Sequence, residues 1–127
     1  MTVTGSGLLS RLEGVITLLG KPADQQKAWA DVEHVGIEEM ILQFFDFVPG
    51  WLDELRKSSM IDDSDELALL RLYVALDLMR RRSDLLEKWS AVANSEEWKR
   101  ARQLSASALL SLRRSRPIGP PGQQATT

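Results

Sequence analysis

Residues 37–51, IEEMILQFFDFVPGW, decide the fold class through the spacing of their apolar side chains. The apolar positions recur every three or four residues, at Ile37, Met40, Ile41, Phe44, Phe47, Val48 and Trp51. This spacing places all of them on one face of an α-helix. Pro49 lacks a backbone donor and crowds the preceding turn. We therefore expect the helix either to bend there or to stop and restart with Pro49 as its first residue.

The rest of the chain has the same helical spacing, and strand-like alternation between turn signals is hard to find. We expect five further helices, at about residues 6–19, 22–34, 64–82, 84–93 and 95–114. Gly36 predicts the end of the second of these helices. The pairs Asp63/Glu66 and Asn94/Glu97 have the spacing of capping boxes, and they predict where two of the later helices begin.

Residues 64–82 carry apolar side chains nearly all round the predicted helix, as is typical of a helix at the centre of a bundle. We therefore predict an all-α fold, a single-domain bundle of five or six helices formed by residues 1–116. The 127 residues leave no room for a second domain. Residues 117–127 are rich in Pro, Gly and Gln, and they are predicted to form a disordered tail that cannot pack a core.

The composition excludes several classes of chemistry. The chain has no Cys and one His, which removes disulfides, thiolate nucleophiles and most zinc or His-based catalytic sites within a single chain. No segment approaches the roughly 18 consecutive apolar residues of a membrane-spanning helix, and residues 8–19 lack the flanks of a secretory signal. We expect a cytoplasmic protein with no cofactor, no metal and no membrane association.

His34 is the one candidate for His chemistry. Asp31 and His34 lie one helical turn apart, as in the Glu-x-x-His motif of di-iron bundles, but that motif must occur twice. A phosphotransfer role is disfavoured because Glu33, Glu38 and Glu39 would repel a phosphoryl donor. We expect His34 to interact with the carbonyl end of its helix. Since nucleophile and phosphate-binding motifs are also missing from the sequence, we do not expect an enzyme.

Charge is divided unevenly between the two halves of the chain. Residues 1–63 carry 5 basic and 11 acidic side chains, whereas residues 64–127 carry 11 basic and 7 acidic ones. The net charge of −2 lacks the basic excess of a nucleic-acid coat protein. The acidic first half instead favours a partner with a basic surface.

The acidic side chains of the first half gather on one side of a predicted helix. Glu39, Asp46 and Asp53 are seven residues apart, which places them within about 40° of one another if Pro49 only bends the helix. Leu42 lies on the same side, and we call Glu39, Leu42, Asp46 and Asp53 the acidic stripe. Phe45 lies beside it.

The acidic stripe has two interpretations. In the first, Leu42 and Phe45 are buried by a basic partner protein while the carboxylates steer and orient that partner. In the second, the stripe is a solvated helix face, with Leu42 and Phe45 covered by another helix of the bundle.

A nucleic-acid-associated protein is the alternative from a different class, and it would use Arg81, Lys99, Arg100 and Arg102. Binding of this kind would weaken steeply with salt. We favour it less because no aromatic residue is interleaved with the basic positions, and because carboxylates lie four residues away. The expected ion pairs are Asp77–Arg81, Glu96–Arg100 and Asp84–Lys88. A third alternative is a self-associating structural module, a homodimer with Trp51 or Trp98 in a symmetric interface.

The sequence also contains a pattern of residues, spread over about residues 36–112, that can be compared with known proteins. It comprises Leu76-Asp77-Leu78-Met79, Trp89, Ser95-Glu96-Glu97-Trp98 with Ala101-Arg102, and then Ala106, Leu109 and Leu112. This pattern resembles a group of small all-helical bacterial proteins of unassigned activity. Where that group has an Asn-rich connection, this chain has Arg80-Arg81-Arg82-Ser83. The resemblance implies a non-enzymatic immunity-type or accessory protein of a secreted toxin, acting by binding another protein.

Overall fold

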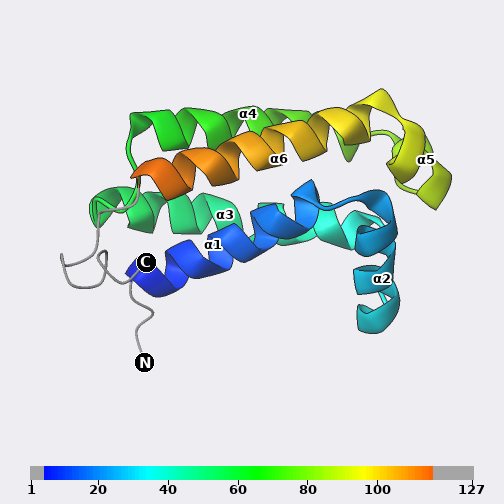
Figure 1. Ribbon diagram of the computed structural model, residues 1–127, viewed down its shortest axis with the longest axis horizontal. Helices are drawn as coiled ribbons and strands as arrows, with labels where there is room; N and C mark the ends of the chain where they lie inside the picture. Colours follow the sequence, from blue (N-terminus) through cyan, green and yellow to red (C-terminus); the bar gives the residue numbers. More distant parts are fainter. Residues whose placement is uncertain (1–4, 116–127) are drawn as a thin grey trace.

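Figure 1 shows the computed structural model of the protein, which describes residues 5–115. In this range the chain forms six α-helices and one short 3-10 helix, and no strand. Their bounds are α1 Gly5–Gly20, α2 Ala23–Glu33, α3 Glu38–Lys57, α4 Asp63–Met79, η1 Ser83–Leu85, α5 Trp89–Asn94 and α6 Glu96–Ser115. The prediction of an all-α single-domain bundle is confirmed. The predicted tail, residues 117–127, lies outside the described residues.

The four long helices α1, α3, α4 and α6 lie lengthwise beside one another (Figure 1). α1 and α4 run in one direction along the bundle, and α3 and α6 run in the other. α6 packs mainly against α4 and α1, α1 also packs against α3, and α3 meets α4. The short helices α2 and α5 contact each other at one end of the bundle, so they leave the long sides of the four helices uncovered.

The core is formed by the inward faces of the four long helices. Burial of these apolar side chains is the main force that holds the helices together. The largest fully buried side chains are Leu12, Ile16, Leu19, Met40, Ile41, Phe44, Leu55, Leu69, Leu72, Leu76, Trp98 and Leu112. Among the helices of the described range, none combines the length and the apolar composition needed to cross a bilayer.

A buried glutamine joins α2 to the end of α1. The Nε2 of Gln26 donates to the carbonyl oxygens of Leu18 and Leu19, each at 3.1 Å. These carbonyls belong to the last turn of α1, where the regular pairing of carbonyls with amides four residues later ends; the carbonyl of Leu18 also accepts from the amide of Lys21 at 3.2 Å. Arg102 of α6 donates in turn to Oε1 of Gln26 at 3.3 Å. Gln26 therefore fixes α2 against both α1 and α6.

The capping residues predicted for two helices, α4 and α6, are each wrong by one residue. Asp62, whose backbone is extended, accepts from the amide of Asp65 at 2.8 Å, and Asp65 accepts from the amide of Asp62 at 3.1 Å. This capping box replaces the expected Asp63/Glu66 pair. Similarly, Ser95 rather than Asn94 caps α6, by accepting from the amide of Trp98 at 3.2 Å. Neighbouring polar residues compete for each cap, and the backbone conformation decides between them.

The prediction of a single helix over residues 84–93 is also wrong. The structure has η1 and α5 there, separated by residues 86–88. The carbonyl oxygen of Leu85 accepts a 2.8 Å hydrogen bond from the buried indole Nε1 of Trp98. This tertiary contact uses an acceptor that a continuous helix would pair with a backbone amide four residues later.

Pro49 lies inside α3, which continues from Glu38 to Lys57. Of the two outcomes expected for Pro49, a stop and restart does not occur. The Pro49 side chain is exposed, so its ring projects from the outer face of the helix. The positions seven residues apart in the acidic stripe therefore belong to one continuous helix. The side chain of Phe47, expected on the apolar face, is not among those described.

α4 departs most from the sequence prediction, because it is not surrounded by other helices. Its inward face is buried, but Leu67, Leu70, Val74 and Leu78 are 51%, 45%, 56% and 61% exposed, respectively. In a four-helix bundle each helix turns one face to the core and the opposite face to solvent. A helix that is apolar all round then leaves half of its apolar side chains uncovered.

Candidate functional site

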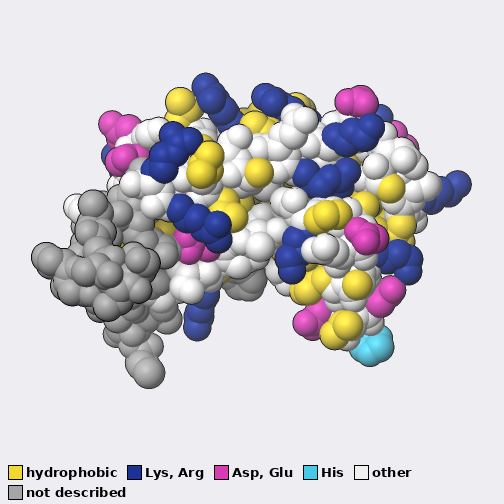
Figure 2. All heavy atoms as spheres, in the orientation of Figure 1, with side chains coloured by type: hydrophobic (Ala, Val, Ile, Leu, Met, Phe, Trp, Pro, Cys, Tyr) yellow, Lys and Arg dark blue, Asp and Glu magenta, His cyan; other side chains and the backbone are white. Residues whose placement is uncertain are grey.

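The most distinctive surface feature of the described residues is a row of exposed aliphatic side chains on α4. We call Leu67, Leu70, Val74 and Leu78 the aliphatic strip. Their spacing of three, four and four residues places them on the face of α4 opposite the buried Leu69 and Leu76. Figure 2 shows hydrophobic side chains reaching the surface over α4 and α6, with Lys and Arg side chains among them. Contiguous apolar surface of this kind marks interaction sites, whereas single exposed apolar residues do not.

The aliphatic strip borders a groove between α4 and α6. One hollow, of about 540 Å³, is lined by the aliphatic strip, Arg71 and Ala75 of α4, and Arg100 and Leu104 of α6. A second hollow, of about 420 Å³, shares Ala75, Leu78 and Arg100 with the first and continues to Met79 and Leu85. The two hollows together form one concave surface, which we call the α4–α6 groove.

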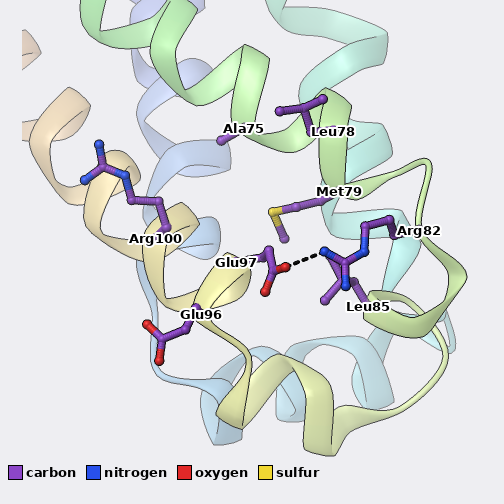
Figure 3. Close-up of a pocket in the computed structure, with 8 residues that line it drawn as sticks. All are labelled: Ala75, Leu78, Met79, Arg82, Leu85, Glu96, Glu97 and Arg100. Atoms are coloured by element: carbon purple, nitrogen blue, oxygen red, sulfur yellow. Dashed lines mark hydrogen bonds and ion pairs between the residues drawn. The ribbon is translucent and has the colours of Figure 1, made fainter.

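An ion-pair cluster closes one end of the α4–α6 groove (Figure 3). Arg82 donates to both carboxylate oxygens of Asp84, at 3.1 and 2.7 Å, and also to Glu97 of α6. These hydrogen bonds raise the pKa of Arg82, and the bonds from Arg82 lower the pKa of Asp84 below its ordinary value of 3.8. In Figure 3 the Met79 side chain points toward Glu97, which is joined to Arg82 by a hydrogen bond.

Two cations in the α4–α6 groove make no ion pair with any described residue. Arg71 comes from α4 and Arg100 from α6, and both side chains are exposed. The neighbouring Glu96, by contrast, pairs with Lys99 at 3.7 Å, and Glu97 pairs with Arg82. The apolar floor of the groove is therefore flanked by positive charge that the described part of the chain does not neutralise.

The acidic stripe lies on α3, where its members differ in exposure. Asp46 and Asp53 are exposed, whereas Glu39 and Leu42 are half-buried. Asp53 forms an ion pair of 3.1 Å with Lys57, and the hydrogen bond with Asp53 raises the pKa of Lys57. Of the two exposed carboxylates, only that of Asp46 makes no ion pair with a described residue. The field of the stripe is therefore weaker than the sequence suggests.

Phe45, the aromatic residue beside the acidic stripe, is packed against α4. Its ring centroid lies 4.9 Å from that of Tyr73, and the guanidinium carbon of Arg80 lies 4.4 Å from the centre of the Phe45 ring. This is a cation–π contact between two helices. The position of Phe45 agrees with the second interpretation of the acidic stripe, in which another helix covers this residue. The contact also places the guanidinium of Arg80 beside the stripe.

The four residues of the nucleic-acid alternative do not form one basic surface. Arg81 pairs with Asp77 at 3.0 Å, as expected. Glu96, however, pairs with Lys99 and not with Arg100, its expected partner. Arg102 is half-buried against Gln26, and burial lowers the pKa of its guanidinium. Since Arg100 lines the groove toward α4, Arg100 and Arg102 lie on different sides of α6. The expected Asp84–Lys88 pair is likewise replaced by Asp84–Arg82.

His34 is the C-cap of α2, which ends at Glu33, one residue before the predicted limit of about residue 34 and three before Gly36. Its backbone is left-handed, at φ 58° and ψ 45°, and the next amide, of Val35, donates to the carbonyl of Ala30 at 3.0 Å. The imidazole is exposed, and Asp31 pairs with Lys27 at 3.0 Å. Within residues 5–115, no three His, Cys, Asp or Glu side chains gather in a way that could hold a metal ion.

The two tryptophans considered for a symmetric interface differ in position. Trp98 is fully buried in the core, so the prediction that it could form an interface is wrong. Trp51 is half-buried and lines a shallow hollow with Trp29, Arg11 and Lys21. That hollow lacks a continuous aliphatic row, and the α4–α6 groove is the better candidate for a docking surface.

The comparisons with known proteins identify no relative: no protein-family model matches the chain, and no curated protein or solved structure is significantly similar to it. The function must therefore be argued from the side chains of this chain alone. The sequence did contain a signal for the groove, namely the excess of apolar residues around residues 64–82. A sequence does not show how many helices surround α4, and so this excess predicts a central helix instead of an exposed apolar face.

Proposed function

We propose that this chain is a non-enzymatic protein-binding module that docks an amphipathic helix of a partner protein in the α4–α6 groove. The observation that carries the proposal is the aliphatic strip, four side chains that are each about half exposed and lie in line on α4. Covering them would release their apolar surface from water, which is the main favourable term in protein association.

The dimensions of the α4–α6 groove favour a helix as the docked segment. From Leu67 to Leu78 the strip covers 11 helical steps, or about 16 Å at 1.5 Å per residue. A partner helix of about three turns would match this length, with its own apolar side chains at three- and four-residue spacing entering the two hollows. Since the groove is concave and open along its length, a rod-shaped segment can enter it from the side.

The acidic stripe is the less favoured docking surface of the same molecule. A basic partner would meet Asp46 and Asp53 there, but Asp53 is already paired with Lys57, and Arg80, which also pairs with Asp77, lies over the Phe45 ring beside the stripe. The apolar anchoring expected from Phe45 is used within the bundle. An immunity-type or accessory role, which the resemblance of the second half implies, agrees with a module that acts by binding and would need a partner with an accessible helix.

A selection from a library of helical peptides displayed on phage tests the proposal. We expect the recovered peptides to lose binding to the Val74→Glu chain, because the new carboxylate lies in the middle of the aliphatic strip. The matched control is Val32→Glu on α2, since Val32 is 76% exposed and remote from the groove. Both variants should keep the thermal midpoint of the original chain. If the recovered peptides bind Val74→Glu as tightly as Val32→Glu, or if no peptide is recovered, the proposal is wrong.

A further inference from the structure

We infer that the helix docked in the α4–α6 groove carries acidic side chains on both flanks of its apolar face. This inference rests on the proposed function and specifies the chemistry of the partner. It reverses the charge that the sequence favours, because the acidic first half of the chain suggests a basic partner. The positions of the unpaired Arg side chains, and not the net charge of either half of the chain, determine which charge the partner should carry.

Arg71 and Arg100 carry the inference because both line the same hollow, one from α4 and the other from α6. Arg71 lies on α4 next to Leu70 of the aliphatic strip, and Arg100 lies on α6, where it lines both hollows. The other cations close to the groove are engaged: Arg82 binds Asp84 and Glu97, and Lys99 pairs with Glu96. A docked helix would bring Arg71 and Arg100 out of bulk water on its two sides.

The cost of withdrawing a charge from water determines which partner fits. A cation that loses water without gaining a partner is destabilising, and a carboxylate placed beside it offsets that loss. Glu97 is already bound by Arg82, and in Figure 3 the side chain of Glu96, which is 3.7 Å from Lys99, points away from that of Arg100. Glu or Asp side chains flanking the apolar face of the partner would supply the missing counter-charges.

A bilayer surface with anionic headgroups is the other surface that combines apolar and negative chemistry. The shape of the site argues against it. A flat bilayer would reach the outermost side chains of α4 but not the floor of the hollows, which is formed by Ala75, Met79 and Leu85. A helix can fill the hollows, so the observations favour a protein partner, and vesicles become one arm of the test.

Two synthetic helical peptides with identical leucines test the inference, one flanked by Glu and the other by Lys. We expect the Glu peptide to bind the original chain about tenfold more tightly in fluorescence anisotropy at low salt, with the difference shrinking as salt is added. The double variant Arg71→Glu with Arg100→Glu should prefer the Lys peptide. The control, Arg113→Glu with Arg114→Glu, makes the same change of charge away from the groove and should keep the original preference.

The remaining outcomes distinguish the inference from the proposed function. If both peptides bind equally and Val74→Glu abolishes both, the inference is wrong and the groove remains a helix-binding site. If neither peptide binds, the proposed function fails as well. If instead phosphatidylglycerol vesicles co-sediment with the original chain but not with Val74→Glu, while the Glu peptide does not bind, the surface is a lipid-binding face and both proposals are wrong.

Discussion

His34 occupies the left-handed region of backbone space, where a Cβ atom costs roughly 1–2 kcal/mol. Replacing it by glycine removes this crowding, although glycine loses more chain entropy on folding. We expect His34→Gly to raise the free energy of unfolding by about 0.5–1 kcal/mol in urea titrations. His34→Ala, which keeps the Cβ, should give no such gain. A clear loss of stability in His34→Gly would mean that the imidazole itself supports the fold.

The sequence predicts the chemistry of single residues better than their exact positions. An acidic capping box before α4 was expected, but it uses Asp62 and Asp65, one residue before the predicted pair. Asp65 also accepts from Ser111 at 2.6 Å, a contact with α6 that no local pattern contains. Cap positions depend on such tertiary contacts, and so a sequence pattern locates them only to within a residue or two.

At the scale of an element, α4 offers two adjacent leucines with opposite surroundings. Leu69 is fully buried, whereas Leu70 is 45% exposed in the aliphatic strip. We expect Leu69→Ala to lower the free energy of unfolding by about 2–5 kcal/mol, since it leaves a cavity in the core. Leu70→Ala should cost less than about 1 kcal/mol, because solvent already reaches this side chain. Equal losses in urea titrations would place α4 at the centre of the bundle, as the sequence suggested.

The cluster of Arg82, Asp84 and Glu97 predicts a specific pH dependence. Because Arg82 lowers the pKa of Asp84, the folded state gains stability at pH values above the ordinary pKa of 3.8, and this gain is lost as the pH falls through the lowered value. Arg82→Gln should therefore be less stable than the original chain near neutral pH. The difference should shrink as the pH falls below 3.8 and the Asp84 carboxylate is protonated.

Urea midpoints measured for both proteins at several pH values check this expectation. Arg81→Gln is the control, because Arg81 pairs with Asp77 only four residues before it, whereas Arg82 joins η1 to α6. A gap between Arg82→Gln and the original chain that does not change with pH would show that the cluster contributes through packing alone.

At the scale of the elements, hydrophobic spacing predicts that helices form and roughly where they lie. The helix around Phe44, the all-α class and a bundle of five or six helices follow from spacing alone. Which neighbours surround a helix does not follow. Spacing places Leu67, Leu70, Val74 and Leu78 on one apolar face, but whether another helix covers that face depends on the arrangement of the bundle. For this reason the sequence does not locate the candidate site, and its charge pattern favours the acidic stripe instead.

For the whole molecule, the charges in the α4–α6 groove predict that the chain does not pair with itself through this surface. A symmetric dimer formed groove to groove would bring Arg71 and Arg100 of both copies together, and this repulsion opposes association. We expect sedimentation at micromolar concentration to give a monomer of 14.3 kDa. A dimer that Val74→Glu converts to monomers would show that a second copy occupies the groove.

The docking claim is tested most directly by a map of the binding surface. Backbone amide chemical shifts, recorded by NMR while the Glu-flanked peptide is added to the ¹⁵N-labelled full chain, report which residues sense the peptide. We predict that the largest changes cluster at Leu70, Val74 and Leu78 of α4 and at Arg100 of α6. Changes centred on Asp46 and Asp53 of α3, with α4 unaffected, would contradict the account.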